Sequence, residues 1–137
     1  MRIFLDANII FSAVVKDGAV RRLLRDLEER GHTLVIHGYV WEEAYRNLQI
    51  HSSSAIETLH HLAVPWEIHP GVPSKKEIDK IEELPHKDRP ILAGAIELGC
   101  ELLLTGDRKH FGRFFGKRIR GIEILSPLQA ASKLLVS

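Results

Sequence analysis

The sequence is poor in cysteine, because Cys100 is the only one among its 137 residues. An intrachain disulfide is therefore excluded, which fits a protein of the reducing cytosol. The first residues contain no hydrophobic region of a signal peptide, and no segment approaches the ~20 apolar residues that a membrane span needs. We therefore expect a cytoplasmic protein with no membrane-spanning segment.

Several motifs of common enzyme classes are also absent. The sequence has neither the Gly-x-Ser-x-Gly turn of many serine hydrolases nor a glycine-rich phosphate-binding loop. Its eight histidines form no His-Glu-x-x-His pattern and have no cysteine pair beside them, so we expect no structural zinc site. The length and an apolar fraction of 45% fit one globular domain over residues 1–137.

Positive charge is concentrated in residues 108–120, although the net charge of the whole chain is only +1. This stretch contains six basic residues and no acid, so the rest of the chain carries 13 basic and 18 acidic residues, a net charge of −5. Lysine and arginine hold phosphates. The candidates for such contacts are Arg108, Lys109, Arg113 and Lys117. The alternative is a solvated charge run whose interleaved phenylalanines pack in the core.

Short apolar runs at residues 3–5, 33–36, 64–68, 102–105 and 122–125 predict about five strands. Pro65 restricts the third of them to the edge of a sheet or the start of a strand. Apolar residues at helical spacing predict helices near residues 20–31, 40–48, 54–62, 74–83, 89–98 and 127–135. Continuous apolar strands that alternate with helices indicate an α/β fold with a central parallel sheet and helices on both faces.

Four acidic residues lie beside these apolar runs and are the candidates for chemistry. Asp6 and Asp107 each follow a predicted strand, and ligands of an open parallel sheet bind beyond the carboxyl ends of its strands. Asp88 begins a helix, and Glu43 lies in the helix after the second strand, within reach of the same edge. Converging carboxylates bind hard divalent cations, which polarise a phosphodiester and activate water. We therefore predict a Mg²⁺ or Mn²⁺ site and phosphoryl-transfer chemistry.

Each of these acids also has a structural explanation. Asp88 would cap its helix, and Asp107 would form a turn with the basic residues that follow it. Asp6 is harder to explain in this way, because Asp6 and Asn8 place two polar side chains within a core-like apolar run.

Glu42 competes with Glu43 for the fourth position. Glu43 falls closer to the apolar stripe of its helix, whereas Glu42 has a surface partner four residues later in Arg46. A helix-surface glutamate is usually solvated, which is the structural explanation for Glu43. The choice between Glu42 and Glu43 stays open.

Three segments resemble the acidic motifs of PIN-domain nucleases. Residues 3–10, IFLDANII, are similar to the opening strand of that family. Residues 88–96, DRPILAGAI, resemble its third acidic motif, and residues 103–111, LLTGDRKHF, resemble its fourth. Glu43, five residues before Leu48, fits the second acid of the family. The motifs occur in the family's order over most of the chain.

The resemblance implies a Mg²⁺- or Mn²⁺-dependent endoribonuclease that hydrolyses RNA phosphodiester bonds. Its catalytic and metal-binding acids would be Asp6, Glu43, Asp88 and Asp107, with Asn8 and Thr105 as supporting polar residues. The basic residues after Asp107 would then contact RNA. Many bacterial and archaeal members of this size resemble VapC toxins, which are silenced by a small antitoxin protein, whereas others have no known partner. Dimers are common among the toxin-like relatives, so the resemblance also implies a homodimer.

Two other interpretations compete with a nuclease. The first is a non-catalytic module that kept the fold and binds RNA or protein. The presence of all four acids argues against it. The second is an α/β phosphatase with Asp6 as a phosphorylated nucleophile. The sequence Asp6-Ala7-Asn8 is a poor match to the Asp-x-Asp of such enzymes, and no lysine motif supports this interpretation.

Overall fold

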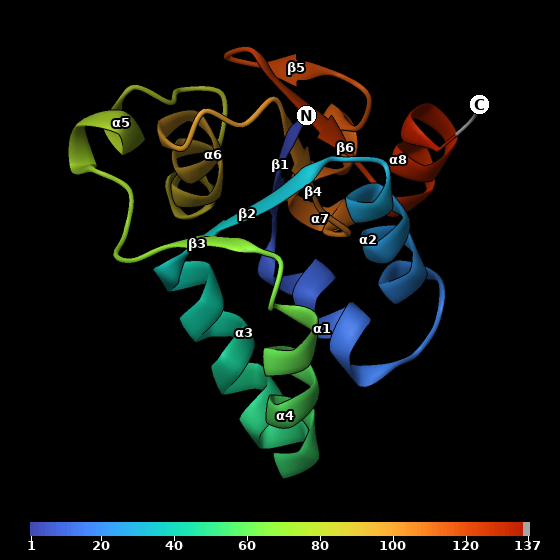
Figure 1. Cartoon of the computed structure of the whole chain (residues 1–137). Helices are drawn as coiled ribbons and strands as arrows, with labels where there is room; N and C mark the ends of the chain where they lie inside the picture. The colour runs from blue at the N-terminus through green and yellow to red at the C-terminus, as the bar shows by residue number, and fades with distance from the viewer. Residues whose placement is uncertain (136–137) are drawn as a thin grey trace.

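The computed structural model describes residues 1–135, so residues 136 and 137 of the expected domain lie outside the described part of the chain. Its centre is a six-stranded sheet in the order β3-β2-β1-β4-β6-β5 (Figure 1). The strands are β1 (Arg2–Leu5), β2 (Thr33–His37), β3 (Glu67–His69), β4 (Leu102–Leu104), β5 (Arg118–Ile119) and β6 (Ile122–Leu125). Every neighbouring pair is parallel except β5 and β6, which are antiparallel.

The sheet confirms the α/β fold with parallel strands, and it adds one strand to the five that the sequence predicted. The additional strand β5 lies within the basic stretch and is only two residues long, so periodicity does not reveal it. It pairs with β6 through a turn in which Arg120 and Gly121 both have positive φ, as short hairpin turns require. The third predicted strand begins at Glu67 rather than at residue 64, and Pro65 therefore precedes an edge strand.

Eight α-helices are found in the described chain. They are α1 (Ala7–Val15), α2 (Ala19–Glu29), α3 (Gly38–His51), α4 (Ser53–Leu62), α5 (Lys75–Asp79), α6 (Arg89–Glu97), α7 (Arg108–Phe111) and α8 (Pro127–Leu134). The sequence did not predict α1, because an almost continuous apolar run shows no helical period. The helix expected over residues 74–83 is wrong in length, since α5 ends at Asp79.

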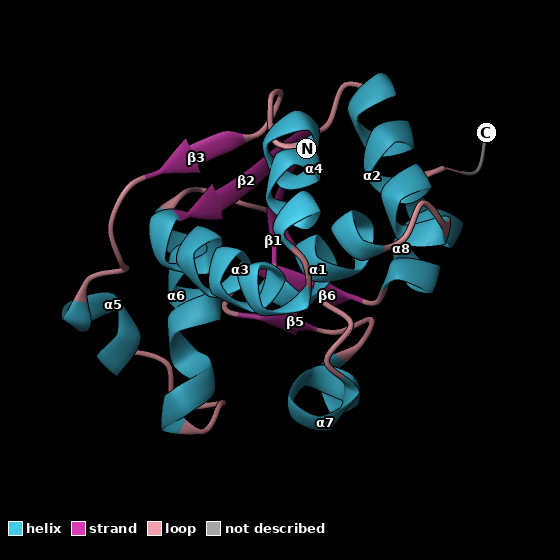
Figure 2. Cartoon of the chain, turned by 90° about the horizontal axis from the view of Figure 1, so that it is seen from below, coloured by secondary structure: helices cyan, strands magenta, loops and turns pink. Residues whose placement is uncertain are grey.

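Helices cover the two faces of the sheet and its carboxyl edge. The helix α6 packs across β1, β2, β4 and β6 on one face, and α2 and α8 lie on the opposite face (Figures 1 and 2). The helices α3 and α4 pack against each other and against α1, and they extend beyond the edge at which β1 and β2 end (Figure 1). Within residues 1–135, no helix is long and apolar enough to cross a membrane.

The strands β1 and β4 lie side by side in the middle of the sheet and fix where the candidate acids emerge. Leu5 of β1 is paired with Leu104 of β4, and both are buried. The backbone N–H of Asp6 donates to the carbonyl oxygen of Leu104 at 3.1 Å, which continues this ladder by one residue. The chain segments that follow the two strands therefore begin next to each other.

Candidate active site

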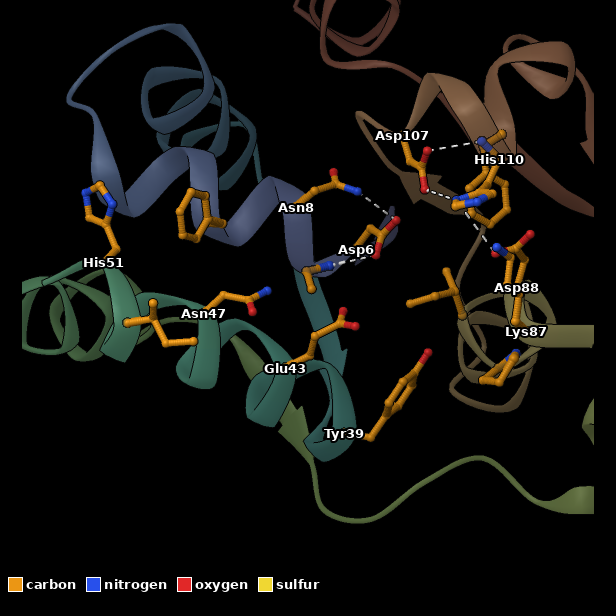
Figure 3. A pocket seen from close by; sticks show the side chains of 16 residues that line it. Asp6, Asn8, Tyr39, Glu43, Asn47, His51, Lys87, Asp88, Asp107 and His110 are labelled. Atoms are coloured by element: carbon orange, nitrogen blue, oxygen red, sulfur yellow. Dashed lines mark hydrogen bonds and ion pairs between the residues drawn. The ribbon is translucent and has the colours of Figure 1, made fainter.

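A pocket of about 680 Å³ opens at the carboxyl edge of the sheet, and four carboxylates line it (Figure 3). They are Asp6, Glu43, Asp88 and Asp107. The four acids come from the end of β1, from α3, from the start of α6 and from the end of β4. The fold thus brings together all four residues that the sequence singled out, although up to 101 positions separate them in the chain.

Asp6 is held between the end of β1 and the first turn of α1. Its Oδ1 accepts a hydrogen bond from the backbone N–H of Ala7 at 2.8 Å, and only 6% of the residue is exposed. Burial raises the pKa of Asp6 to about 6, and the negative charges of Glu43 and Asp107 add to this effect. The hydrogen bonds from Thr105 and Ala7 limit the increase, because they stabilise the charged form.

Asn8 and Thr105, predicted as supporting residues, connect the segments after β1 and β4. The Thr105 hydroxyl donates to Asp6 Oδ2 at 2.8 Å and accepts from the backbone N–H of Asp107 at 3.1 Å. The Asn8 amide donates to Asp6 Oδ2 at 3.1 Å, while its oxygen accepts from the backbone N–H of Gly106 at 2.9 Å. These bonds fix Asp6 against the loop that carries Asp107.

Asp107 is held in place by the first turn of α7. Its Oδ1 accepts from the backbone N–H of His110 at 3.0 Å, and its Oδ2 lies 2.6 Å from Nδ1 of the same histidine. Burial by itself raises the pKa of Asp107, but the hydrogen bonds and the charge of His110 outweigh it and lower the pKa overall. His110 therefore orients one of the four acids.

Asp88 is buried where it faces the pocket, with 8% of the residue exposed. Its side chain makes no capping hydrogen bond to α6, so the expectation that Asp88 caps this helix is wrong. One oxygen, Oδ1, lies 3.8 Å from His110 Nδ1 (Figure 3). The other, Oδ2, is buried and has no hydrogen-bond partner within the described chain. An unpartnered carboxylate oxygen is costly to bury unless it meets a cation.

The fourth acid is Glu43 and not its neighbour Glu42, which does not line the pocket. Glu43 extends from α3 toward Asp6 (Figure 3), and its charge contributes to the raised pKa of Asp6. The expected ion pair of Glu42 with Arg46 is not formed among residues 1–135. One residue of helical rotation separates the two glutamates, and it decides which side chain faces the pocket.

The pocket also contains residues that sequence reasoning missed. They are Phe11, Tyr39, Asn47, Ile50, His51 and Lys87. Burial raises the pKa of Tyr39 far above its usual value, with the charges of Asp6 and Glu43 adding to it, so its hydroxyl stays neutral and can donate a hydrogen bond. Helical spacing was the available signal, because Tyr39 and Asn47 each lie four residues from Glu43.

The four basic residues predicted to contact RNA do not line this pocket. Arg108 borders a separate depression formed with residues near the start of α8. The Arg113 guanidinium lies 4.6 Å from the centre of the Phe114 ring. Lys109 and Lys117 are exposed. RNA contact by these residues stays a prediction, whereas Lys87, beside Asp88, is the lysine that the pocket contains. Phe111 is buried in the core, as the alternative for this stretch proposed.

The donor set fits a hard divalent cation. All four acids offer carboxylate oxygens, which Mg²⁺ and Mn²⁺ prefer, and Asp88 Oδ2 is buried without another partner. Within residues 1–135, no three His, Cys, Asp or Glu side chains are close enough to form a preassembled cage. Mg²⁺ keeps several of its waters and takes only one or two carboxylates, so a pocket bordered by four acids suits it without such a cage.

The fold is similar to those of two solved VapBC structures. One is VapBC2 from Rickettsia felis bound to a DNA fragment from its promoter, with a TM-score of 0.69 and 20% identity over 92% of this chain and 98% of that chain. The other is VapBC-1 from nontypeable Haemophilus influenzae, with a TM-score of 0.61 and 16% identity over 93% and 99%. At these identities the likeness establishes the fold, which is α/β and PIN-like.

Comparison of the sequence itself adds nothing to this likeness. No model of a protein family matches the chain, and no curated protein matches it.

Proposed function

We propose that this chain is a VapC-like PIN nuclease that hydrolyses RNA phosphodiester bonds with the help of Mg²⁺ or Mn²⁺. The observation that carries the proposal is the convergence of Asp6, Glu43, Asp88 and Asp107 on one pocket at the carboxyl edge of the sheet. The acidic motifs of the sequence and the PIN-like fold support the same conclusion independently.

The side chains of the pocket have distinct parts in this proposal. Asp6, Glu43, Asp88 and Asp107 would hold the cation, which when bound supplies charge neutralisation at the phosphate and a more acidic water. Thr105 and Asn8 keep the Asp6 carboxylate oriented, and His110 does the same for Asp107. Lys87 offers a positive charge to a neighbouring phosphate, and the neutral Tyr39 hydroxyl can donate to a phosphate oxygen.

The proposal extends to a toxin that a small antitoxin protein silences, in the cytoplasm. It is supported by the PIN-like fold shared with chains of VapBC complexes. RNA as the substrate and a homodimeric state also belong to the proposal, and they rest on the resemblance of the motifs. The competing function is a non-catalytic RNA- or protein-binding module, and the pocket opposes it because all four acids are present and face one space.

The decisive experiment is cleavage of single-stranded RNA by the purified chain with added Mn²⁺ or Mg²⁺. We expect cleavage that EDTA stops and that Asp6→Asn lowers at least ~100-fold, because a carboxylate of the cation site is lost. The neighbouring glutamates provide a matched pair within one helical turn. Glu43→Gln should lose cleavage to a similar extent, whereas Glu42→Gln should keep it, as only Glu43 lines the pocket.

Two results would contradict the proposal. Full cleavage in EDTA would show that no divalent cation takes part, and full activity of Glu43→Gln would separate cleavage from this pocket. RNA binding by the wild type without cleavage under either metal would favour the non-catalytic module instead.

A further inference from the structure

We infer that the pocket contains a second subsite, which binds one base of single-stranded RNA against aromatic side chains. This inference rests on the proposed function, because the base belongs to a nucleotide near the phosphate that the acids receive. The subsite is formed by Phe11, Asn47, Ile50 and His51. We call these four residues the aromatic end. Figure 3 shows that Asn47 and His51 lie on the opposite side of Glu43 from Asp88.

The aromatic end is connected to the acids by one face of α3. Glu43, Asn47 and His51 follow one another at intervals of four residues, and all three line the pocket. The eight residues from Glu43 to His51 span about 12 Å along the helix axis. A nucleic acid chain bound with a phosphate at the acids therefore has neighbouring nucleotides within reach of the aromatic end.

The charge of the aromatic end differs from that of the acids. Its four residues include no Asp, Glu, Lys or Arg, so none of them carries a permanent charge that would repel or attract a phosphate. A nucleobase is uncharged and planar, and its edge carries hydrogen-bond donors and acceptors. The Asn47 amide carries one acceptor and two donors, which is the chemistry that pairs with such an edge.

The ring geometry suits stacking of a base. Phe11 of α1 and His51 of α3 meet edge to face, with ring centroids 5.7 Å apart and planes at 78°. A base that stacks on one ring thus meets the other at its side, and such stacking accepts any base because each has a π-face. Ile50, beside them, is 82% exposed, and a bound base would cover part of this apolar side chain.

The test measures binding by an inactive protein, so cleavage does not interfere. Fluorescent single-stranded RNAs of about four nucleotides would be titrated with the Asp6→Asn variant and followed by anisotropy. Each would be compared with the same RNA lacking one base, at every position in turn. We expect removal of one base to weaken binding about 5- to 150-fold, the effect of one base–aromatic stack, and the other positions to change it less.

Variants of the aromatic end identify where that base lies. Adding His51→Ala or Phe11→Leu to the inactive protein should remove the difference between the intact and the abasic RNA. His51 is exposed, so its substitution leaves the fold intact, and Phe11→Leu retains an apolar side chain where Phe11 packs on the core. The matched control is His61→Ala, an exposed histidine of α4 outside this pocket, which should retain the full difference.

Two outcomes would overturn the inference. One is equal binding of the intact RNA and every abasic RNA. The other is an unchanged base-dependent difference in both His51→Ala and Phe11→Leu, which would show that the base binds outside the aromatic end. Failure of the proposed function is seen separately, as absence of cleavage by the wild type with metal, because the binding assay requires no cleavage.

Discussion

At Asp6, the raised pKa shows the free-energy cost of burying a carboxylate in this pocket. Asp6 is buried, and its carboxylate is used twice, once to begin α1 and once to face the other acids of the pocket. Burial and the charges of Glu43 and Asp107 favour the protonated form, which is why the pKa rises to about 6. Without a cation, the charged site is therefore expected to destabilise the fold at neutral pH.

This expectation gives a prediction for the pH dependence of stability in EDTA. Between about pH 4 and 6 the unfolded chain releases the Asp6 proton while the folded chain keeps it, so stability falls as the pH rises. Above pH 6 the full effect is present and amounts to about 3 kcal/mol for a rise from 3.8 to about 6. Asp6→Asn should therefore be more stable than the wild type at pH 8, by up to about 3 kcal/mol, and equally stable at pH 4.

Urea unfolding at pH 4 and pH 8 measures this difference. Asp79→Asn, at an exposed aspartate of α5 outside the pocket, serves as the control and should show no pH-dependent difference from the wild type. If Asp6→Asn were less stable than the wild type at pH 8, or if the difference in stability did not change with pH, the surroundings would not destabilise the charged form of Asp6.

For Asp88 and Glu43, local sequence rules and the tertiary structure favour different explanations. Asp88 begins a helix, where an aspartate is usually a cap, yet its side chain makes no capping bond and keeps one buried oxygen without a partner. Glu43 is exposed like an ordinary helix glutamate, yet it faces the other acids. For both residues the local sequence favours the structural explanation, and only the neighbours in space oppose it.

At the scale of elements, α6 is the helix that carries Asp88 to the pocket, and it lies very close to the sheet. A Cβ atom on Gly94 would be 2.9 Å from His37 Cδ2 and 3.0 Å from Phe4 Cζ. His37 and Phe4 are themselves buried, and their rings contact each other edge to face, so neither side chain has space to withdraw. Glycine at this position therefore sets the distance between α6 and strands β1 and β2.

Gly94→Ala should push α6 away from the sheet. We expect a loss of about 1–3 kcal/mol in the free energy of unfolding, as for other overpacked cores, and a lower cleavage rate because Asp88 moves with the helix. The matched control is Gly112→Ala, where the nearest atom to the new Cβ would be Arg108 Cβ at 3.7 Å, an ordinary contact. Thermal unfolding of both variants measures their stability relative to the wild type. A Gly94→Ala protein as stable as the wild type would show that α6 can shift freely.

The elements also explain which predictions from periodicity failed. The helix α1 is buried on most of its surface, so its apolar residues form a run rather than a stripe. The strand β5 has only two residues and depends on its pairing with β6, which no local pattern encodes. In contrast, β1, β2, β4 and β6 are continuous buried strands of a parallel sheet, and their apolar runs were sufficient to predict them.

At the scale of the whole molecule, the acids of the pocket couple cation binding to folding. The four carboxylates come from distant parts of the chain, so the complete site exists only in the folded protein. A cation that binds the folded state alone stabilises it by mass action. Millimolar Mn²⁺ at 100 times its Kd should add about 2.7 kcal/mol and raise the Tm by roughly 8 °C for a chain of this length.

This shift should depend on each acid of the pocket and on no neighbouring acid. Asp6→Asn and Asp88→Asn should lose most of the Mn²⁺-dependent increase in Tm, whereas Glu42→Gln should retain it. Differential scanning calorimetry with Mn²⁺ and with EDTA provides the comparison. An equal increase in all three variants would place the ion elsewhere on the surface, and no increase in the wild type would argue against a shared cation site.

The sequence by itself determined the fold class, most of the strands and three of the four acids that line the pocket. Continuous apolar runs and the motifs around Asp6, Asp88 and Asp107 are local, so they can be detected in the chain without knowing its path in space. The tertiary structure decided which acid of the pair Glu42 and Glu43 faces the pocket. It also gave His110 its place beside Asp107. It joined Phe11 of α1 to His51 of α3 in an aromatic end, because contacts between distant segments follow from packing and not from spacing along the chain.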